Sequence, residues 1–117
     1  MQEQKPLTIE TTMHGKTAVI APDGRMDADS ASLFETECDR AVSQGAAHLI
    51  VDLSHLNYVS SMGLRSFLRV AKARKAKSGG LAIVNLNGFV KQVFDITQLT
   101  RLFQVYETVD QALQAMP

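Results

Sequence analysis

Apolar and polar residues alternate at the start of the chain. Between residues 7 and 13, Leu, Ile, Thr and Met alternate with more polar residues, which is the period of a half-buried strand. Residues 14–16 supply a turn, and residues 17–21 form a second strand rich in Ala, Val and Ile. Because proline removes a ladder donor and glycine permits unusual backbone angles, we expect strand pairing to stop at residues 22–24, which read Pro-Asp-Gly. The pattern predicts an antiparallel hairpin.

From about Asp29 the period becomes that of a helix. One stripe of this predicted helix is apolar and consists of Ala31, Phe34, Cys38, Ala41 and Val42. Ser32 and Glu35 have the spacing of a capping box, and Asp29 or Ser30 would cap a slightly longer helix equally well. The helix is expected to end at residues 44–45, Gln-Gly.

Residues 48–53 form a short, continuous apolar run, which is typical of a strand covered by helices on both faces. We expect this strand at the centre of the sheet. Residues 54–59 are interpreted as a connection. Apolar residues then return at helical spacing, in a helix that stops before Ser78 and contains Leu64, Phe67, Leu68 and Ala71.

The last third of the chain repeats this alternation of strands and helices. Residues 81–84 predict a strand, residues 89–94 a short amphipathic helix, and residues 102–106 a final edge strand. Thr108 and Gln111 have capping-box spacing ahead of a helix that runs to the C-terminus. The order predicts an α/β fold in which a mixed sheet of four to five strands is packed with about four helices.

Length and composition restrict the classes of protein. A chain of 117 residues has room for one domain with a single core. With 45% apolar residues and zero formal net charge, it is neither a disordered chain nor a protein with the basic excess of a nucleic-acid binder. We therefore expect no nucleic-acid partner.

The N-terminal residues and the single cysteine indicate where in the cell the protein is expected. Cys38 is the single cysteine, so no internal disulfide can form, and a reducing cytoplasmic setting fits best. Residues 1–6 are polar and are expected to form a flexible tail before a domain at residues 7–117. No apolar run approaches the roughly 18 residues of a membrane span, so no direct membrane insertion is expected.

The stretch from Tyr58 to Leu64 carries the candidate chemistry. It places Ser60 and Ser61 where the connection enters the second helix. A helix start leaves backbone N–H groups without partners and carries a partial positive charge, so a serine there is commonly a cap, which for Ser60 is about as well supported as a functional role. A phosphate on Ser61 would meet the same N–H groups and the same dipole, so the fold tolerates a phosphoserine there.

If phosphorylation leaves the helix intact, it acts on whatever docks around Ser61. The added charge of nearly two units disrupts a flush apolar contact. Met62, bulky and adaptable, fits such a contact surface and fits equally well as a core residue of the first helical turn. Both interpretations of Met62 remain open.

Three segments together resemble a known family. Residues 24–27 (Gly-Arg-Met-Asp), residues 58–64 (Tyr-Val-Ser-Ser-Met-Gly-Leu) and residues 94–99 (Phe-Asp-Ile-Thr-Gln-Leu) resemble the STAS domain of bacterial anti-sigma factor antagonists, in order and at family spacing. The resemblance covers essentially the whole chain. It implies that residues 7–117 form a STAS domain.

The resemblance also implies a phosphorylation site. The family motif is usually Asp-Ser-Ser/Thr-Gly, and the serine directly after the Asp is phosphorylated. Matched residue by residue, the phosphoserine falls on Ser61 and the glycine on Gly63. Ser60 stands in place of the motif Asp and Met62 in place of its second Ser or Thr, so the acid beside the phosphoacceptor is lost. Asp27 resembles the family's acidic residue in the loop near the same site, and it is also compatible with a turn residue or a helix cap.

The resemblance implies that the protein acts as a partner switch and needs no catalytic group of its own. The unphosphorylated domain, expected to be a monomer when free, binds a serine-kinase anti-sigma factor. Phosphorylation releases that partner until a PP2C-type phosphatase removes the phosphate. Because the motif Asp is missing, a non-phosphorylated STAS subunit of a membrane lipid transporter complex is the alternative function.

The helix after Ser61 is rich in cations, which include Arg65, Arg69, Lys72, Arg74, Lys75 and Lys77. Cations near a helix C-terminus suit the dipole and more often form a solvated face than a binding site. Arg65 and Arg69 lie one turn apart and close to the motif. They are the candidate pair for docking to an acidic patch on a kinase.

Enzyme and cofactor classes find little support. The segment 60–63 lacks the first glycine of a Gly-x-Ser-x-Gly elbow, and no motif ties His14, His48 or His55 to Ser61 as a base. The histidines also lack zinc spacing, and the glycines at 79–80 end a helix rather than form a phosphate loop. We expect no enzymatic activity, no metal and no cofactor.

Overall fold

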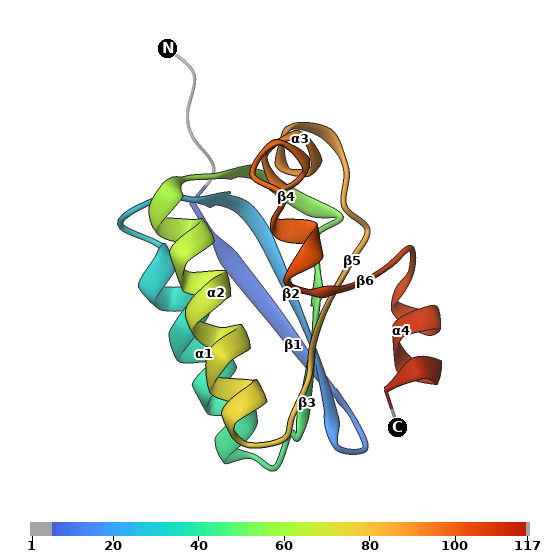
Figure 1. Cartoon of the computed structure of the whole chain (residues 1–117). Helices are drawn as coiled ribbons and strands as arrows, with labels where there is room; N and C mark the ends of the chain where they lie inside the picture. The colour runs from blue at the N-terminus through green and yellow to red at the C-terminus, as the bar shows by residue number, and fades with distance from the viewer. Residues whose placement is uncertain (1–5, 117) are drawn as a thin grey trace.

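The computed structural model describes residues 6–116, so the predicted flexible tail at residues 1–6 lies outside the described residues except for Pro6. The elements follow one another as shown in Figure 1: β1 (Thr8–His14), β2 (Thr17–Met26), α1 (Ala31–Ser43), β3 (His48–Asp52), β4 (His55–Val59), α2 (Ser61–Ala76), β5 (Leu81–Val84), α3 (Gly88–Ile96), a 3-10 turn (Leu99–Arg101), β6 (Gln104–Tyr106) and α4 (Val109–Ala115).

The mixed sheet predicted from the sequence is confirmed. Its strand order is β1-β2-β3-β5-β6, with β4 attached to β2. β1 and β2 form the expected antiparallel hairpin, and the other pairs are parallel. β3 occupies the centre as predicted, and β6 is the predicted edge strand. Across residues 6–116 the sheet has six strands, because residues 54–59 also contain one.

Two expectations about β2 and β4 were wrong, and they were wrong for the same reason. Strand pairing does not stop at residues 22–24, because β2 runs on to Met26 and Pro22 stays paired with Ile9 of β1. On its other side, β2 pairs with β3 from Thr17 to Ile20 and with β4 from Asp23 onward. Pro22 lies between the residues of β2 that pair with β3 and those that pair with β4. The N–H that proline lacks therefore falls where the parallel hydrogen-bond ladder is interrupted. The supposed connection at residues 54–59 is therefore largely strand β4.

Helices cover both faces of the central strand. α1 and α2 lie side by side on one face (Figure 1), where Leu49 and Val51 of β3 join the larger core cluster. Ile50 points to the other face and packs in a smaller cluster with Ala112 and Met116 at the C-terminal helix. The larger core is centred on Phe67, whose ring lies 4.7 Å from that of Phe34 and 5.6 Å from that of Phe94.

Cys38 is buried in α1 as a small apolar residue, as its pattern predicts. Burial is the main cause that raises the pKa of its thiol well above the usual range. The thiol therefore stays protonated in the core.

Polar groups fix the start of α1 and its contact with α2. Ser30 occupies the cap position but makes no side-chain cap bond. The capping-box role considered for Glu35 does not form. Its carboxylate instead accepts a 2.6 Å hydrogen bond from the buried Ser66 hydroxyl of α2 and lies 3.5 Å from the Arg69 guanidinium. At α4, by contrast, Thr108 caps the N–H of Gln111 as predicted.

The first turn of α2 lies unusually close to the ends of β2 and β4. The Ser60 N–H donates to the Met26 carbonyl at 2.9 Å, which ties the helix entry to the end of β2. A Cβ on Gly63 would lie 2.8 Å from Cγ2 of Val59 and 3.1 Å from the Met26 carbonyl oxygen. Only a residue without a side chain fits this approach.

We expect Gly63→Ala to lower the free energy of unfolding by about 1–3 kcal/mol, because the added methyl overpacks this contact. Urea denaturation followed by circular dichroism measures the change. Ala73→Gly, at an exposed site of α2, is the control and should cost about 1 kcal/mol through helix propensity alone. If propensity also governed residue 63, Gly63→Ala would stabilise the protein, and that sign would contradict the close approach.

Candidate functional site

Ser60 is the cap of α2. Its backbone is extended, with φ −89° and ψ 174°, and its hydroxyl accepts the Gly63 N–H at 3.2 Å. The preceding backbone bond to Met26 fixes its position. Ser60 therefore has a defined structural role as the helix cap, which is one of the two roles that the sequence left open for it.

Ser61 is the first residue of α2 and is exposed. The helix that follows it is sixteen residues long and has no acidic residue in its first turn. The positive end of the helix dipole is thus not neutralised by a carboxylate of that turn. A hydroxyl at this place is accessible to another protein, and a charge added to it lies at the favourable end of the dipole.

Met62 lies on the surface, with 42% of its area exposed, so it is not a core residue of the first turn. Gly63 beside it is buried against β2 and β4. Ser60 and Gly63 thus hold the start of the helix in place, whereas Ser61 and Met62 between them face outward.

Asp27 organises its own loop. Its carboxylate accepts the N–H groups of Asp29 and Ser30, each at 3.0 Å, and the Ser30 hydroxyl at 3.1 Å. The backbone bond from Ser30 is the largest of the causes that lower the pKa of Asp27 below its usual range. The loop lies beside the site because Met26, the preceding residue, accepts the Ser60 N–H.

The two candidate docking arginines differ in their surroundings. Both side chains are exposed, but Arg69 is directed to Glu35 of α1 by the ion pair described above. Arg65 has no ion pair within residues 6–116, and it lies one turn after Ser61. Arg74 of the same cationic helix is buried and donates to the Ala47 carbonyl at 3.4 Å, so its role is structural.

The structure adds a stack of side chains that was not expected from the sequence. The Arg25 guanidinium carbon lies 4.0 Å from the centre of the Tyr58 ring. The Phe89 ring stacks on Tyr58 with centroids 5.6 Å apart and planes at 5°. Arg25 and Tyr58 meet because they are register partners of β2 and β4. The sequence pattern predicts a connection and no strand at residues 54–59, so it gives no reason to expect this contact.

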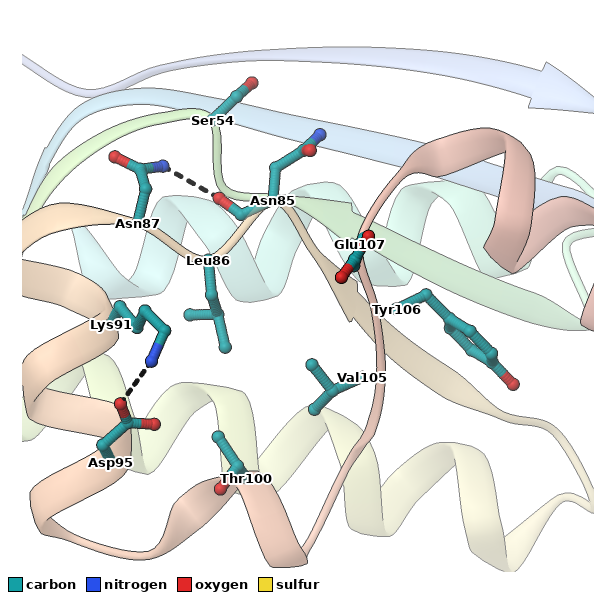
Figure 2. A pocket seen from close by; sticks show the side chains of 10 residues that line it. All are labelled: Ser54, Asn85, Leu86, Asn87, Lys91, Asp95, Thr100, Val105, Tyr106 and Glu107. Atoms are coloured by element: carbon teal, nitrogen blue, oxygen red, sulfur yellow. Dashed lines mark hydrogen bonds and ion pairs between the residues drawn. The ribbon is translucent and has the colours of Figure 1, made fainter.

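A separate hollow lies away from Ser61. It has a volume of about 660 Å³ and opens between α3, the end of β5 and β6, as Figure 2 shows. Its walls consist of Ser54, Asn85, Leu86, Asn87, Lys91, Asp95, Thr100, Val105, Tyr106 and Glu107. The Lys91 ammonium is bound to the Asp95 carboxylate at 2.6 Å. None of the candidate residues near Ser61 lines it.

Two further properties hold for the described part of the chain. Residues 6–116 contain no group of three or more His, Cys, Asp or Glu side chains placed to hold a metal ion. No helix within these residues is long and apolar enough to cross a membrane.

Known proteins resemble this chain in sequence and in structure. A model of the STAS domain family matches residues 8–112. BtrV of Bordetella bronchiseptica, a proposed anti-sigma factor antagonist, is 33% identical over 92 residues, which is 79% of each chain. The crystal structure of an anti-sigma factor antagonist from Mycobacterium paratuberculosis matches with a TM-score of 0.82 at 25% identity, over 95% of this chain and 94% of that one.

A third similarity concerns the fold alone. SpoIIAA, described as a Bacillus cell fate determinant and solved in its phosphorylated form, matches with a TM-score of 0.69 at 21% identity, over 94% of this chain and 98% of that one. The family match spans nearly all of the described residues and includes both loops that meet at Ser60. This chain belongs to the STAS domain family.

Proposed function

We propose that the protein is an anti-sigma factor antagonist that works as a phosphorylation-controlled partner switch, with Ser61 as phosphoacceptor. The observation that carries the proposal is the exposed hydroxyl of Ser61 at the first position of a long helix whose first turn has no acid. Family membership and the names of the relatives support the class of function.

Local electrostatics support the position of the phosphate. A phosphoserine at the start of a helix interacts favourably with free backbone N–H groups and with the dipole, so α2 keeps its structure. The fold shared with the phosphorylated form of SpoIIAA is in keeping with this expectation. The effect of the phosphate is therefore on the surface and not on the fold.

The proposed switch follows from that surface. Unphosphorylated, the outward face of Ser61 and Met62 binds a serine-kinase anti-sigma factor, and the partner's own target is released. Phosphorylation adds nearly two negative charges to an interface that includes an exposed methionine, and the partner dissociates. A PP2C-type phosphatase then restores the binding form.

Because the motif Asp is missing, the groups that activate the Ser61 hydroxyl for phosphorylation come from the partner. Ser60 is occupied as the helix cap, and the Asp27 carboxylate accepts hydrogen bonds from its own loop. The kinase therefore supplies the groups that activate the Ser61 hydroxyl, and this protein, in the cytoplasm, is a substrate and binding partner without catalysis of its own. If the protein gains no phosphate, the alternative function is that of a non-phosphorylated STAS subunit of a membrane lipid transporter complex.

With its cognate serine kinase and ATP, the protein should gain one phosphate on Ser61, measured by intact mass and by fragmentation of the peptide. Ser61→Ala should gain none. Ser60→Ala should keep the site but lose about 0.5–2 kcal/mol of stability with its cap. No phosphate on the wild-type chain, with a kinase shown to be active, would exclude the switch.

Ser61→Asp should weaken kinase binding at least tenfold, whereas Ser61→Ala should bind like the wild type, because only the first adds charge to the contact. Isothermal titration calorimetry measures both affinities. Thermal melts should show Ser61→Asp to be as stable as the wild type, since a carboxylate suits this helix end. Equal binding by the two variants would contradict charge exclusion even if Ser61 is phosphorylated.

Arg65→Ala should weaken kinase binding more than Arg69→Ala, because the Arg69 guanidinium is already directed to Glu35. Each substitution should change stability by less than about 0.5–1 kcal/mol, since both side chains are exposed. Isothermal titration calorimetry with the kinase, at two salt concentrations, measures the affinities of the two variants. A larger effect of Arg69→Ala would show that the partner displaces the Glu35 contact.

A further inference from the structure

Arg65 is a cation without a counter-charge, one turn after the proposed phosphoacceptor. Its side chain is exposed, and within residues 6–116 it forms no ion pair and no hydrogen bond. Other arginines of α2 have partners. The Arg69 guanidinium lies 3.5 Å from the Glu35 carboxylate, and the buried Arg74 donates to a backbone carbonyl at 3.4 Å. Arg65 thus has its donors available for another contact.

The helix dipole does not account for a cation at residue 65. Arg74 and Lys75 lie in the last turn of α2, at the negative end of the dipole, where cations are stabilised. Arg65 lies one turn from the first residue of the helix, near the positive end, where a cation gains nothing from the dipole. The residue one turn further along, Arg69, is also a cation, and like charges at this spacing repel. Both effects favour an anion beside Arg65.

The unmodified helix α2 does not supply that anion. Between Ser61 and Ala76 it has neither Asp nor Glu. Glu35 of α1 reaches α2, but its carboxylate accepts from the Ser66 hydroxyl at 2.6 Å and pairs with Arg69. A phosphate on Ser61 would therefore be the one negative group on the whole of α2.

Helix geometry brings residues 61 and 65 together. Both side chains are exposed, and residues four apart lie on the same face of a helix with their Cβ atoms about 5–6 Å apart. The Cα–Cβ bonds of a helix tilt toward its N-terminus, so a long side chain at Arg65 leans over the turn that begins at Ser61. An anion four residues before a cation is also the favourable order along a helix.

We propose that Arg65 is the internal partner of the phosphate on Ser61, an inference that rests on the proposed function. The planar guanidinium can bind two phosphate oxygens at once, and the free N–H groups of the first turn are further donors to the phosphate. In the unphosphorylated protein the same guanidinium is available to an acidic patch of the kinase. Phosphorylation therefore adds charge at Ser61 and, in the same step, withdraws Arg65 from the docking surface.

The test uses the full chain with phosphoserine encoded at residue 61, so it does not depend on the cognate kinase. A pH titration followed by phosphorus NMR measures the second pKa of the phosphate, which a neighbouring cation lowers because it favours the dianion. Arg65→Gln should raise this pKa by about 0.2–0.4, the size expected of an exposed pair at this spacing, and Arg65→Lys should raise it less. The matched control is Lys72→Gln, which removes an exposed cation about three turns from residue 61 and should change the pKa by less than about 0.1.

A second measurement observes the arginine directly. In nitrogen NMR of the phosphorylated wild type, the Nε–H signal of Arg65 should titrate with the same midpoint as the phosphate, and that of Arg69 should not.

The outcomes separate the two proposals. An unchanged phosphate pKa in Arg65→Gln, an equal rise in Lys72→Gln, or an Arg65 signal that ignores the phosphate would each refute the internal contact. If the active kinase phosphorylates Ser61 and the contact is refuted, the switch stands without it. If the contact is found but the kinase adds no phosphate, the proposed function fails and the pairing of the two side chains stands.

Discussion

The arrangement of this domain depends on the contact between the first turn of α2 and the ends of β2 and β4. One backbone hydrogen bond, from Ser60 to Met26, joins the start of α2 to the end of β2, two points more than thirty residues apart in the chain. The absence of a side chain at Gly63 lets the helix approach Val59 and Met26 closely enough for that bond to form. The position of Ser61 at the surface is a direct result, because Ser60 before it and Gly63 two residues after it are both held against β2 and β4.

Much of the fold could be predicted from local pattern. The apolar run of β3, the helical stripes of α1 and α2 and the capping residues of α4 each depend on physics within a few residues. The second half of β2 and the strand β4 could not be predicted in this way. Their pairing is decided by the change of neighbour at Pro22, and a proline in the sequence indicates a break unless the interruption of the ladder is known.

The candidate site shows the same division. The cap at Ser60, one of two roles that the sequence left open, agrees with the chemistry of a helix start, and Ser61 begins α2 where the sequence placed the helix entry. The exposure of Met62 and the commitment of Asp27 to its own loop were left open by the sequence and needed coordinates. The contact of Arg25 with Tyr58 depends on strand register, with a bulge between Gly24 and Arg25, and no local pattern gives that information.

The change of neighbour along β2 also divides this one strand into two parts with different structural roles. Residues 17–20 are enclosed by β1 and β3 in the middle of the sheet, where substitutions are limited by volume and are felt throughout the core. From Asp23 onward the strand runs beside the short β4, and its last residue, Met26, is buried in the core and gives its carbonyl to the start of α2. A substitution in the first half is therefore felt mainly within the sheet, whereas one near Met26 shifts the helix entry and with it the place of Ser61.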